Sequence, residues 1–384
     1  MRKTTKLIAV LMTLAMVVAM FAACGNSQAP AQNQAAEAPA EAPAEAPAEQ
    51  IVIGKVPITL SHNVHGNDSK WAKIYAEEKY GAEYLTIDPE QDEAKSIAAC
   101  ETFIAQGVDG IILHPVTETS CNEVISEIRD AGIACITYNV DDSSHQVPFL
   151  AIDEAGVAEQ MGKDMVKQWV ELYPDTPVSI GLISWTNITF CFDNRTGPFL
   201  KGARSVVDYL PNDIVYQNAA GEDCWGATYW EHAGGDYEKA VSLTADAIVK
   251  HPEVNIVYGD NEQNGTGALA AYEAAGRGTA VDGIPQTEII ASTDGSAGEL
   301  AKIADPSSSL KYCLGMQPQS FAYDEIDMIM RVINGELDPD TYVVEYTPDV
   351  YINYYAMSLQ EIQDWYNTQY LPEVELDLVG QFGA

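Results

Sequence analysis

The chain reads Gly107-Val108-Asp109-Gly110-Ile111-Ile112-Leu113-His114-Pro115 at its most informative point, a short apolar run set between turn residues. The run 110–113 is typical of a buried strand. A helical pattern over 119–130 and a second apolar run over 133–138 follow it. Strands that are apolar on both faces and are separated by helices indicate a parallel sheet covered on both sides. This stretch therefore predicts an α/β fold.

The same alternation continues in both directions along the chain. Before residue 153 we predict strands at 51–58, 82–87, 110–113 and 133–138 and helices at 69–79, 93–106 and 119–130. A second set has strands at 178–184, 214–216, 255–258 and 288–292 and helices at 154–171, 197–207, 237–250 and 264–275. The remaining elements are a helix at 298–304, a strand at 310–316, a helix at 323–333 and a strand at 342–346.

This last group is too short for a third domain, so we expect it to complete the two earlier sheets. The chain after residue 50 is long enough for two lobes of about 150 residues each. We predict two Rossmann-like lobes with parallel sheets, joined by a multi-strand hinge. The first lobe comprises 51–152 plus 318–347, and the second comprises 153–317 plus 348–384.

The N-terminus predicts export. Basic residues in the first six positions precede an apolar run over 7–21, and Ala22-Ala23-Cys24-Gly25 resembles a bacterial lipoprotein cleavage site. We expect a signal peptide over 1–23 and a lipid on Cys24, since the apolar run is too short for a membrane span of about 20 residues. Because Phe21 stands where such sites usually carry Leu, an ordinary secretory peptide cut nearby is the alternative.

The segment that follows, 24–50, is rich in Ala, Pro and Glu and contains no aromatic or branched apolar side chain. It has nothing to bury in a core, so we expect a disordered linker that tethers the folded body. The formal net charge of the chain is −37 at pH 7. Such acidity disfavours nucleic acid and anionic lipid headgroups as partners, and it does not identify a ligand.

Six cysteines follow Cys24, and their spacing shows no Cys-x-x-Cys pair and no small disulfide scaffold. Most are expected to be buried thiols. Cys191 and Cys224 fall in loop-like stretches, and the sequence leaves open whether they form a disulfide.

Polar side chains follow several predicted strands at their carboxyl ends, where ligands bind in open parallel sheets. They are Ser61-His62-Asn63, Asn139-Val140-Asp141, Trp185 and Asn187, Asp260-Asn261, and Asp294. Carboxylates and amides bind adjacent hydroxyl groups, Arg donates in a fork, and an aromatic face covers the C–H surface of a sugar ring. This mixture suits a sugar.

An ordered series of motifs resembles the type I periplasmic binding proteins, in particular their ribose-binding-like sugar branch. The series consists of 107–115, Ala131-Gly132-Ile133, Arg195 with Gly197-Pro198-Phe199, 258–262, 292–295 and Met316-Gln317-Pro318, and it covers about residues 51–350. The resemblance implies sugar contacts at Asn63, Asn139, Arg195, Asp260, Asp294 and Gln317, with Gln317 at the hinge. Trp185 is a candidate for stacking on the ring, with packing in the lobe core as the alternative.

One departure from the family bears on specificity. Ribose-binding relatives carry an Asp-Arg pair at the end of the fourth strand, where this chain has Asn139-Val140. Without that Arg clamp, the pocket is expected to suit another sugar or a sugar-like polyol, with Asp141 or His65 as substitutes for the missing contact.

Catalytic and cofactor motifs do not stand out. The six histidines lack zinc-site spacing, residues 88–93 lack the glycine of a calcium loop, and the sequence has neither a Gly-x-Ser-x-Gly elbow nor a phosphate loop. We therefore expect no enzyme activity, no metal and no cofactor.

The sequence thus predicts a monomeric, lipid-anchored, extracytoplasmic protein that captures a monosaccharide or related sugar for the permease of an ABC importer. The alternatives are a sensor that presents a quorum-sensing furanose, nucleoside or polyol to a receptor and, less favoured, a surface glycan hydrolase. No role is predicted for residues 353–384.

Overall fold

The computed structural model describes residues 50–383 except Asn187. The predicted signal peptide 1–23, the predicted lipid site Cys24 and the linker up to Glu49 lie outside the described residues. Within the described part of the chain, no helix combines the length and the apolar character needed to cross a membrane.

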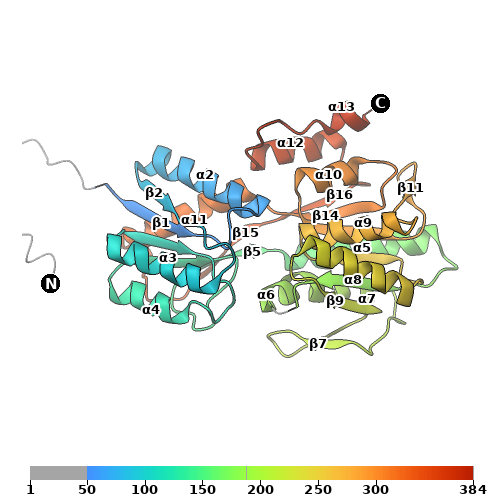
Figure 1. The fold of residues 1–384 in the computed structure, drawn as a ribbon, viewed down its shortest axis with the longest axis horizontal. Coiled ribbons are helices and arrows are strands. Elements are labelled where there is room, and N and C mark those ends of the chain that lie inside the picture. Colours follow the sequence, from blue (N-terminus) through green and yellow to red (C-terminus); the bar gives the residue numbers. More distant parts are fainter. Residues whose placement is uncertain (1–49, 187, 384) are drawn as a thin grey trace, which may run out of the picture. The chain divides into compact units, whose positions relative to one another are not determined.

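The first sheet has six parallel strands in the order β15-β5-β4-β3-β1-β2 (Figure 1). Its strands are β1 (Val52–Val56), β2 (Glu83–Thr86), β3 (Gly110–Leu113), β4 (Ala134–Tyr138), β5 (Phe149–Asp153) and β15 (Val344–Pro348). Helices α2 (Asn63–Tyr80) and α11 (Pro318–Ile333) pack together beside it, and α3 (Glu93–Gln106) packs on α4 (Asn122–Asp130).

Strand β3 shows why the run 110–113 is apolar at every position. Ile112 belongs to the hydrophobic cluster that contains α2 and α11 residues, whereas Ile111 and Leu113 belong to the cluster built with α3 and α4. Successive side chains of a strand point to opposite faces, so both faces of this strand are buried.

A buried charge cluster joins one face of the first sheet to its helices. Lys55 of β1 donates to Asp68 of α2 and to Glu325 of α11, and all three side chains are fully buried. The ammonium group also lies 4.4 Å from the centroid of the Tyr138 ring. A buried charge is tolerated only when it is paired, so Lys55 fixes both helices on β1.

The second sheet also has six strands, in the order β16-β14-β13-β10-β6-β9, and only β16 runs antiparallel to its neighbour. Its strands are β6 (Ile180–Ser184), β9 (Tyr229–His232), β10 (Ile256–Gly259), β13 (Ile289–Asp294), β14 (Leu310–Gly315) and β16 (Val350–Asn353). The associated helices are α5 (Ala155–Leu172), α7 (Gly197–Arg204), α8 (Tyr237–Lys250), α9 (Glu262–Ala274) and α10 (Ala297–Ala304).

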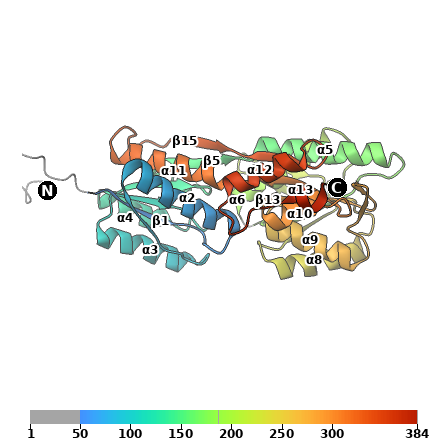
Figure 2. The same ribbon diagram turned by 90° about the horizontal axis from the view of Figure 1, so that it is seen from above.

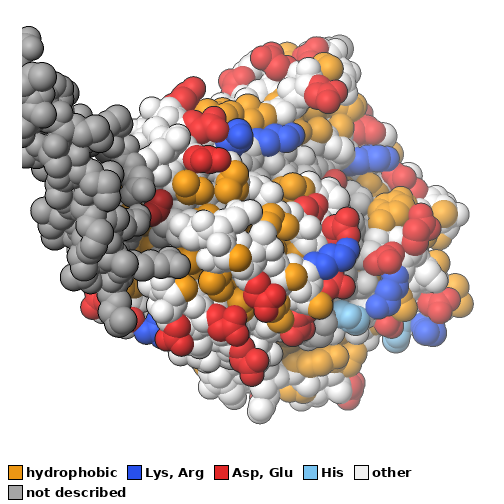
Figure 3. All heavy atoms as spheres, turned by 60° about the vertical axis from the view of Figure 1, so that its left-hand side comes forward, with side chains coloured by type: hydrophobic (Ala, Val, Ile, Leu, Met, Phe, Trp, Pro, Cys, Tyr) orange, Lys and Arg blue, Asp and Glu red, His pale blue; other side chains and the backbone are white. Residues whose placement is uncertain are grey.

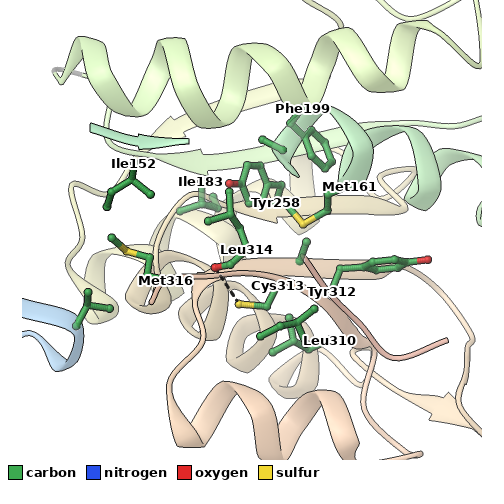
Figure 4. Close-up of a cluster of buried hydrophobic side chains, with 14 of the residues drawn as sticks. Ile152, Met161, Ile183, Phe199, Tyr258, Leu310, Tyr312, Cys313, Leu314 and Met316 are labelled. Carbon is green, nitrogen blue, oxygen red and sulfur yellow. Dashed lines mark hydrogen bonds between the residues drawn. The ribbon is translucent and has the colours of Figure 1, made fainter. Parts of the chain in front are cut away.

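One part of the core of this second lobe lies between its sheet and the pair α5 and α7 (Figure 4). The rings of Phe199 and Tyr258 stack there with centroids 4.7 Å apart, and Met161 and Ile183 lie beside them. Helices α5 and α7 approach each other closely because glycine stands at both contacts. A Cβ on Gly162 would lie 2.1 Å from the carbonyl oxygen of Phe199, and one on Gly202 would lie 1.9 Å from that of Glu159.

Smaller elements complete the described chain. They are the short helix α6 (Thr189–Cys191), the π-helix Phe192–Thr196, the hairpins β7 (Val215–Gln217) with β8 (Asp223–Trp225) and β11 (Ala280–Val281) with β12 (Ile284–Pro285), and the C-terminal helices α12 (Leu359–Gln369) and α13 (Leu378–Phe382).

The chain passes between the two sheets three times, through β5 into α5, through β14 into α11 and through β15 into β16 (Figure 2). The α/β prediction with parallel sheets and a multi-strand connection is therefore confirmed.

Three element predictions need correction. The predicted strand 214–216 belongs to an exposed hairpin, and the sheet position is taken by β9, whose Tyr229 ring lies where a side chain on Gly181 would stand. Strand β5 was not predicted. Helix α2 begins at Asn63, not at residue 69. Gly66 and Asn67 disfavour helix, but the Asn67 side chain donates to the Asn63 carbonyl oxygen and supports the first turn.

Candidate ligand-binding site

The site is a pocket at the carboxyl ends of strands from both sheets. The first sheet contributes residues that follow β1, β2, β3 and β4, and the second contributes residues that follow β6, β10 and β14 or end β13. They are Ile58, His62, His65, Gln91, His114, Val116, Asn139 and Val140 from the first, and Trp185, Ile188, Phe190, Cys191, Arg195, Asn261, Asp294 and Met316 from the second.

Arg195 lies in the π-helix Phe192–Thr196 and is 5% exposed. Its Nε and Nη2 groups each donate to one oxygen of Glu154 at 2.6 Å, and Nη1 donates to the Asp260 carbonyl oxygen at 2.7 Å. Burial lowers the pKa of the guanidinium, but the Glu154 carboxylate outweighs it and raises that pKa, so Arg195 stays cationic. Glu154 directly follows β5, and the pair thus joins a crossing between the sheets to the pocket.

Asp294 ends β13 and forms a second ion pair. Its Oδ2 lies 3.2 Å from Nε2 of His62 and accepts from the Glu262 backbone N–H at 2.9 Å. Burial alone raises the pKa of Asp294, but His62 and Arg195 outweigh it and lower that pKa. Burial lowers the pKa of His62, and Asp294 more than compensates and raises it. Each partner therefore favours the charged form of the other, and both side chains line the pocket.

Three histidines form one wall of the pocket. The ring centroid of His65 lies 5.2 Å from that of His62 and 5.0 Å from that of His114. His114 Nδ1 lies 2.7 Å from the Pro115 carbonyl oxygen, which only an N–H can approach, so Nε2 accepts from the Asn139 amide at 3.0 Å. Burial lowers the pKa of His114 to about 4, and the ring is neutral at pH 7.

Three buried polar atoms of the histidine and asparagine side chains in this wall are left without a hydrogen-bond partner among the described residues. Within the described part of the chain, the buried Asn139 Oδ1, His65 Nδ1 and His62 Nδ1 have no hydrogen-bond partner. Buried polar atoms are nearly always paired in folded proteins, so these atoms are suited to a ligand. Asn139 also has a φ of 61°, in the left-handed region that Asn tolerates.

Asp260 lies beneath the pocket and does not line it. Its Oδ2 accepts from the Trp185 backbone N–H and its Oδ1 from the Asn264 amide, both at 2.8 Å. Burial raises its pKa to about 6. Asp260 therefore positions the backbone of Trp185, a residue that lines the pocket.

The structure thus brings four of the predicted site residues together, namely Asn139, Trp185, Arg195 and Asp294. Asn63 lies at the start of α2 and lines a neighbouring hollow. Gln317 donates to the Pro348 carbonyl oxygen at 2.6 Å, where two crossings between the sheets meet. Both lie outside the residues that line this pocket.

Sequence reasoning omitted several residues of the pocket from the candidate set. The strand-end rule selected the segments that contain His62 and Asn261, but neither residue was carried into the candidate set. His114 directly follows the predicted strand 110–113, so the same rule could have found it. Glu154 was missed because strand β5 before it was missed.

Neither a three-ligand metal cluster nor a disulfide is found among the described residues. No group of three His, Cys, Asp or Glu side chains among them is arranged to hold a metal ion. All six cysteines there are free thiols, Cys191 and Cys224 included.

The family model described as periplasmic binding protein domain matches residues 53–337. The ribose import binding protein RbsB of Bacillus subtilis is 20% identical over 252 residues, which cover 63% of this chain and 68% of that protein. The galactofuranose-binding protein YtfQ of Escherichia coli is 25% identical over 231 residues, or 57% of this chain and 67% of that protein.

A solved structure supports the fold. An ABC transporter solute binding protein from Bacillus halodurans with bound myo-inositol matches at a TM-score of 0.63 and 19% identity, covering 83% of this chain and 98% of that chain. The likeness confirms the two-lobed architecture predicted from the sequence.

Proposed function

Since the chain belongs to the periplasmic binding protein family, with the type I fold, we propose that it binds an uncharged monosaccharide or polyol and delivers it to the permease of an ABC importer. Membership of this family implies a location outside the cytoplasm. Attachment to the membrane through a lipid on Cys24 and the linker 24–50 is part of the proposal. The proposal also includes the division into two lobes, the first comprising 51–152 plus 318–347 and the second comprising 153–317 plus 348–384.

The observation that carries the proposal is the set of hydrogen-bonding groups that both sheets supply to one pocket. Arg195 has five N–H donors, and the three bonds to Glu154 and Asp260 leave two for a ligand. On the opposite side, Asn139 Oδ1 and His65 Nδ1 are buried without partners among the described residues. Adjacent hydroxyl groups of a sugar match such a mixture.

Apolar faces complete the site. Trp185 and Phe190 line the same pocket, and aromatic faces of this kind cover the C–H surface of a sugar ring. The names of the relatives support the class, because RbsB is called a ribose import binding protein and YtfQ a galactofuranose-binding protein.

The charge of the pocket favours an uncharged ligand. Among the described lining residues Arg195 is the one Lys or Arg, and Glu154 compensates it; His62 is compensated by Asp294. Asp260 lies close behind. A carboxylate or phosphate on the ligand would approach these acids without an unpaired cation to receive it, and its desolvation would cost free energy.

Binding couples to closure of the lobes. A ligand that contacts Asn139 and Asp294 at once favours the state in which both sheets line the pocket, and it shifts the equilibrium by its differential affinity for that state. The three crossings between the sheets are the segments about which the lobes move. The permease then recognises the closed, loaded state.

The test is thermal unfolding of the purified protein against matched pairs: galactose with galacturonic acid, ribose with ribose 5-phosphate, and myo-inositol alone. A ligand at a hundredfold excess over its Kd adds about 2.7 kcal/mol, a shift of several degrees. We expect a neutral compound to raise the midpoint and its acidic counterpart to leave it unchanged. A larger shift with the acidic counterpart would contradict the proposal, and so would a panel in which nucleosides alone act.

A further inference from the structure

The C-terminal strap, defined here as residues 354–383, lies beyond the residues 53–337 that the family model matches. It contains α12 and α13, and α12 begins with a capping box between Ser358 and Glu361. Ile362 and Leu378 are fully buried in the main hydrophobic cluster. The strap is therefore folded onto the body, where α12 contacts α11 and α10 (Figures 1 and 2).

Tyr370 connects the strap to the backbone of Asp294, a residue that lines the pocket. The Tyr370 side chain is 1% exposed, and its hydroxyl donates to the Asp294 carbonyl oxygen at 2.7 Å. The Met316 backbone N–H donates to the same oxygen at 3.1 Å. Burial raises the pKa of Tyr370, so the hydroxyl keeps its proton and remains a donor.

The backbone that Tyr370 contacts is conformationally unusual. Asp294 has a φ of 104° and Gly295 has a φ of 79°, so two successive residues lie outside the usual region. Such a conformation is strained for a residue with a side chain and needs support from its surroundings. Trp365 supplies part of it, since a Cβ on Gly295 would lie 2.6 Å from the indole ring.

The residues on either side of Tyr370 bind the first lobe. The Gln369 carbonyl oxygen accepts from Trp71 Nε1 at 2.8 Å, and the Leu371 backbone N–H donates to Asn67 Oδ1 at 2.9 Å. Trp71 and Asn67 both belong to α2. Three consecutive residues of the strap thus connect a helix of the first lobe to the end of β13 in the second.

We propose that Tyr370 is a positioning residue for ligand binding: its hydroxyl, supported by the strap, holds the Asp294 backbone so that the carboxylate faces His62 and the ligand. The strap also makes the placement of Asp294 depend on α2, because the same three residues contact both. The inference rests on the proposed function for the role of Asp294 in binding, whereas the placement of Asp294 against His62 needs no ligand.

The variant Tyr370→Phe removes the hydroxyl and keeps the ring. We expect it to weaken binding of the sugar found in the unfolding panel about fivefold to tenfold, the loss of one buried hydrogen bond. The matched control is Tyr355→Phe, since the Tyr355 hydroxyl also donates to a backbone carbonyl, that of Gly283 in the remote β11–β12 hairpin. The control should bind as the wild type does.

A second readout is the titration of His62, followed by NMR of the ring protons without any ligand. Burial and Arg195 lower the pKa of His62, Asp294 and Glu262 raise it, and the neutral His65 lies beside it. If Tyr370 positions Asp294, then Tyr370→Phe lowers the pKa of His62, and Tyr355→Phe leaves it unchanged. A general loss of stability would not move this pKa selectively.

The two readouts separate failure of this inference from failure of the proposed function. If the wild type binds no sugar but Tyr370→Phe still lowers the pKa of His62, the proposed function fails and the positioning role holds. If the wild type binds a sugar and Tyr370→Phe changes neither the Kd nor the His62 titration, the positioning role is wrong. Trp71→Phe, which removes the donor to Gln369, provides a second variant from the first lobe, and it should change both readouts in the same direction.

Discussion

At the level of single residues, the pocket depends on buried charges that are paired inside the protein. Glu154 is fully buried and Arg195 nearly so, and their two hydrogen bonds are both 2.6 Å long. Removing one partner leaves an uncompensated charge in the interior, which costs far more than the pair itself contributes. The pair therefore sets both the stability of the region and the orientation of the guanidinium.

Replacing Glu154 with Gln should lower the free energy of unfolding by on the order of 3 to 5 kcal/mol, because the Arg195 charge stays buried without a counterion. Urea unfolding without ligand measures it. Glu159→Gln is the control, since Glu159 pairs with Lys201 at the surface and such pairs contribute about 1 kcal/mol or less. Equal effects of the two variants would contradict the account.

The neutral His114 makes a pH-dependent contribution to stability. Burial lowers its folded-state pKa to about 4 from a usual 6.5, so the unfolded chain takes up the proton first as pH falls. The stabilisation that the neutral His114 ring contributes to the folded state is fully present above about pH 6.5 and decreases as the pH falls towards 4. We expect the stability difference between the wild type and His114→Gln to fall by about 2 kcal/mol between pH 8 and pH 5. A constant difference across this range would show that burial leaves the pKa of His114 at its unfolded-state value.

The site could be predicted from sequence only in part, for a physical reason. Residues that directly follow a strand are found by the strand-end rule, as Asn139 and Asp294 were. Contacts that join distant segments leave no local pattern. Nothing in the spacing of Glu154 and Arg195, or of Asp294 and Tyr370, shows that the fold brings each pair together.

At the level of elements, the close approach of α5 and α7 brings Arg195 to the pocket, because the π-helix that carries Arg195 leads directly into α7. The approach depends on Gly162 and Gly202, as their hydrogen atoms face the backbone of the partner helix. Side chains at either position would push the helices apart and shift the residues before α7.

Gly162→Ala should therefore destabilise the protein by about 2 kcal/mol or more, since its methyl group would lie 2.1 Å from the Phe199 carbonyl oxygen. The matched control is Gly156→Ala in the same helix. A Cβ there meets nothing within 4 Å, and alanine favours helix over glycine by up to about 1 kcal/mol. Thermal unfolding should give a lower midpoint for the first variant only. A lower midpoint for both would mean that helix approach is not the cause.

The order of strands and helices was largely predictable because buried parallel strands are apolar at every position, as in 110–113. Strand β5 was not predicted, because its five residues lie between a turn and a helix without a clear boundary in the sequence. The segment 214–216 has strand-forming residues, but it pairs in an exposed hairpin. Whether a strand joins the sheet depends on tertiary packing, here of Tyr229 over Gly181.

At the level of the whole molecule, charge and connectivity fit a protein that captures a small ligand. Acidic side chains are spread over the face drawn in Figure 3, in keeping with the net charge of −37. A spread of like charge favours solubility and disfavours anionic partners. Beneath this surface, the three crossings between the sheets and the strap hold the two lobes around one pocket.

On the proposed mechanism, ligand binding should make the molecule more compact, because one ligand would reach both Asn139 and Asp294, which belong to different sheets, only when the lobes are closed. Small-angle X-ray scattering should show a smaller radius of gyration with saturating sugar than without it. Asp294→Asn at the same sugar concentration should keep the larger value. An unchanged radius in the wild type would mean that the ligand binds without closure.

Titration calorimetry of the sugar identified in the unfolding panel tests the central claim most directly, with the wild type, Asn139→Ala and Asp294→Asn. These variants alter one residue from each sheet, so we predict that each weakens binding at least tenfold, about 1.4 kcal/mol, and that the acidic counterpart of the sugar releases no heat. If both variants bind the sugar as tightly as the wild type does, the pocket between the two sheets is not the binding site.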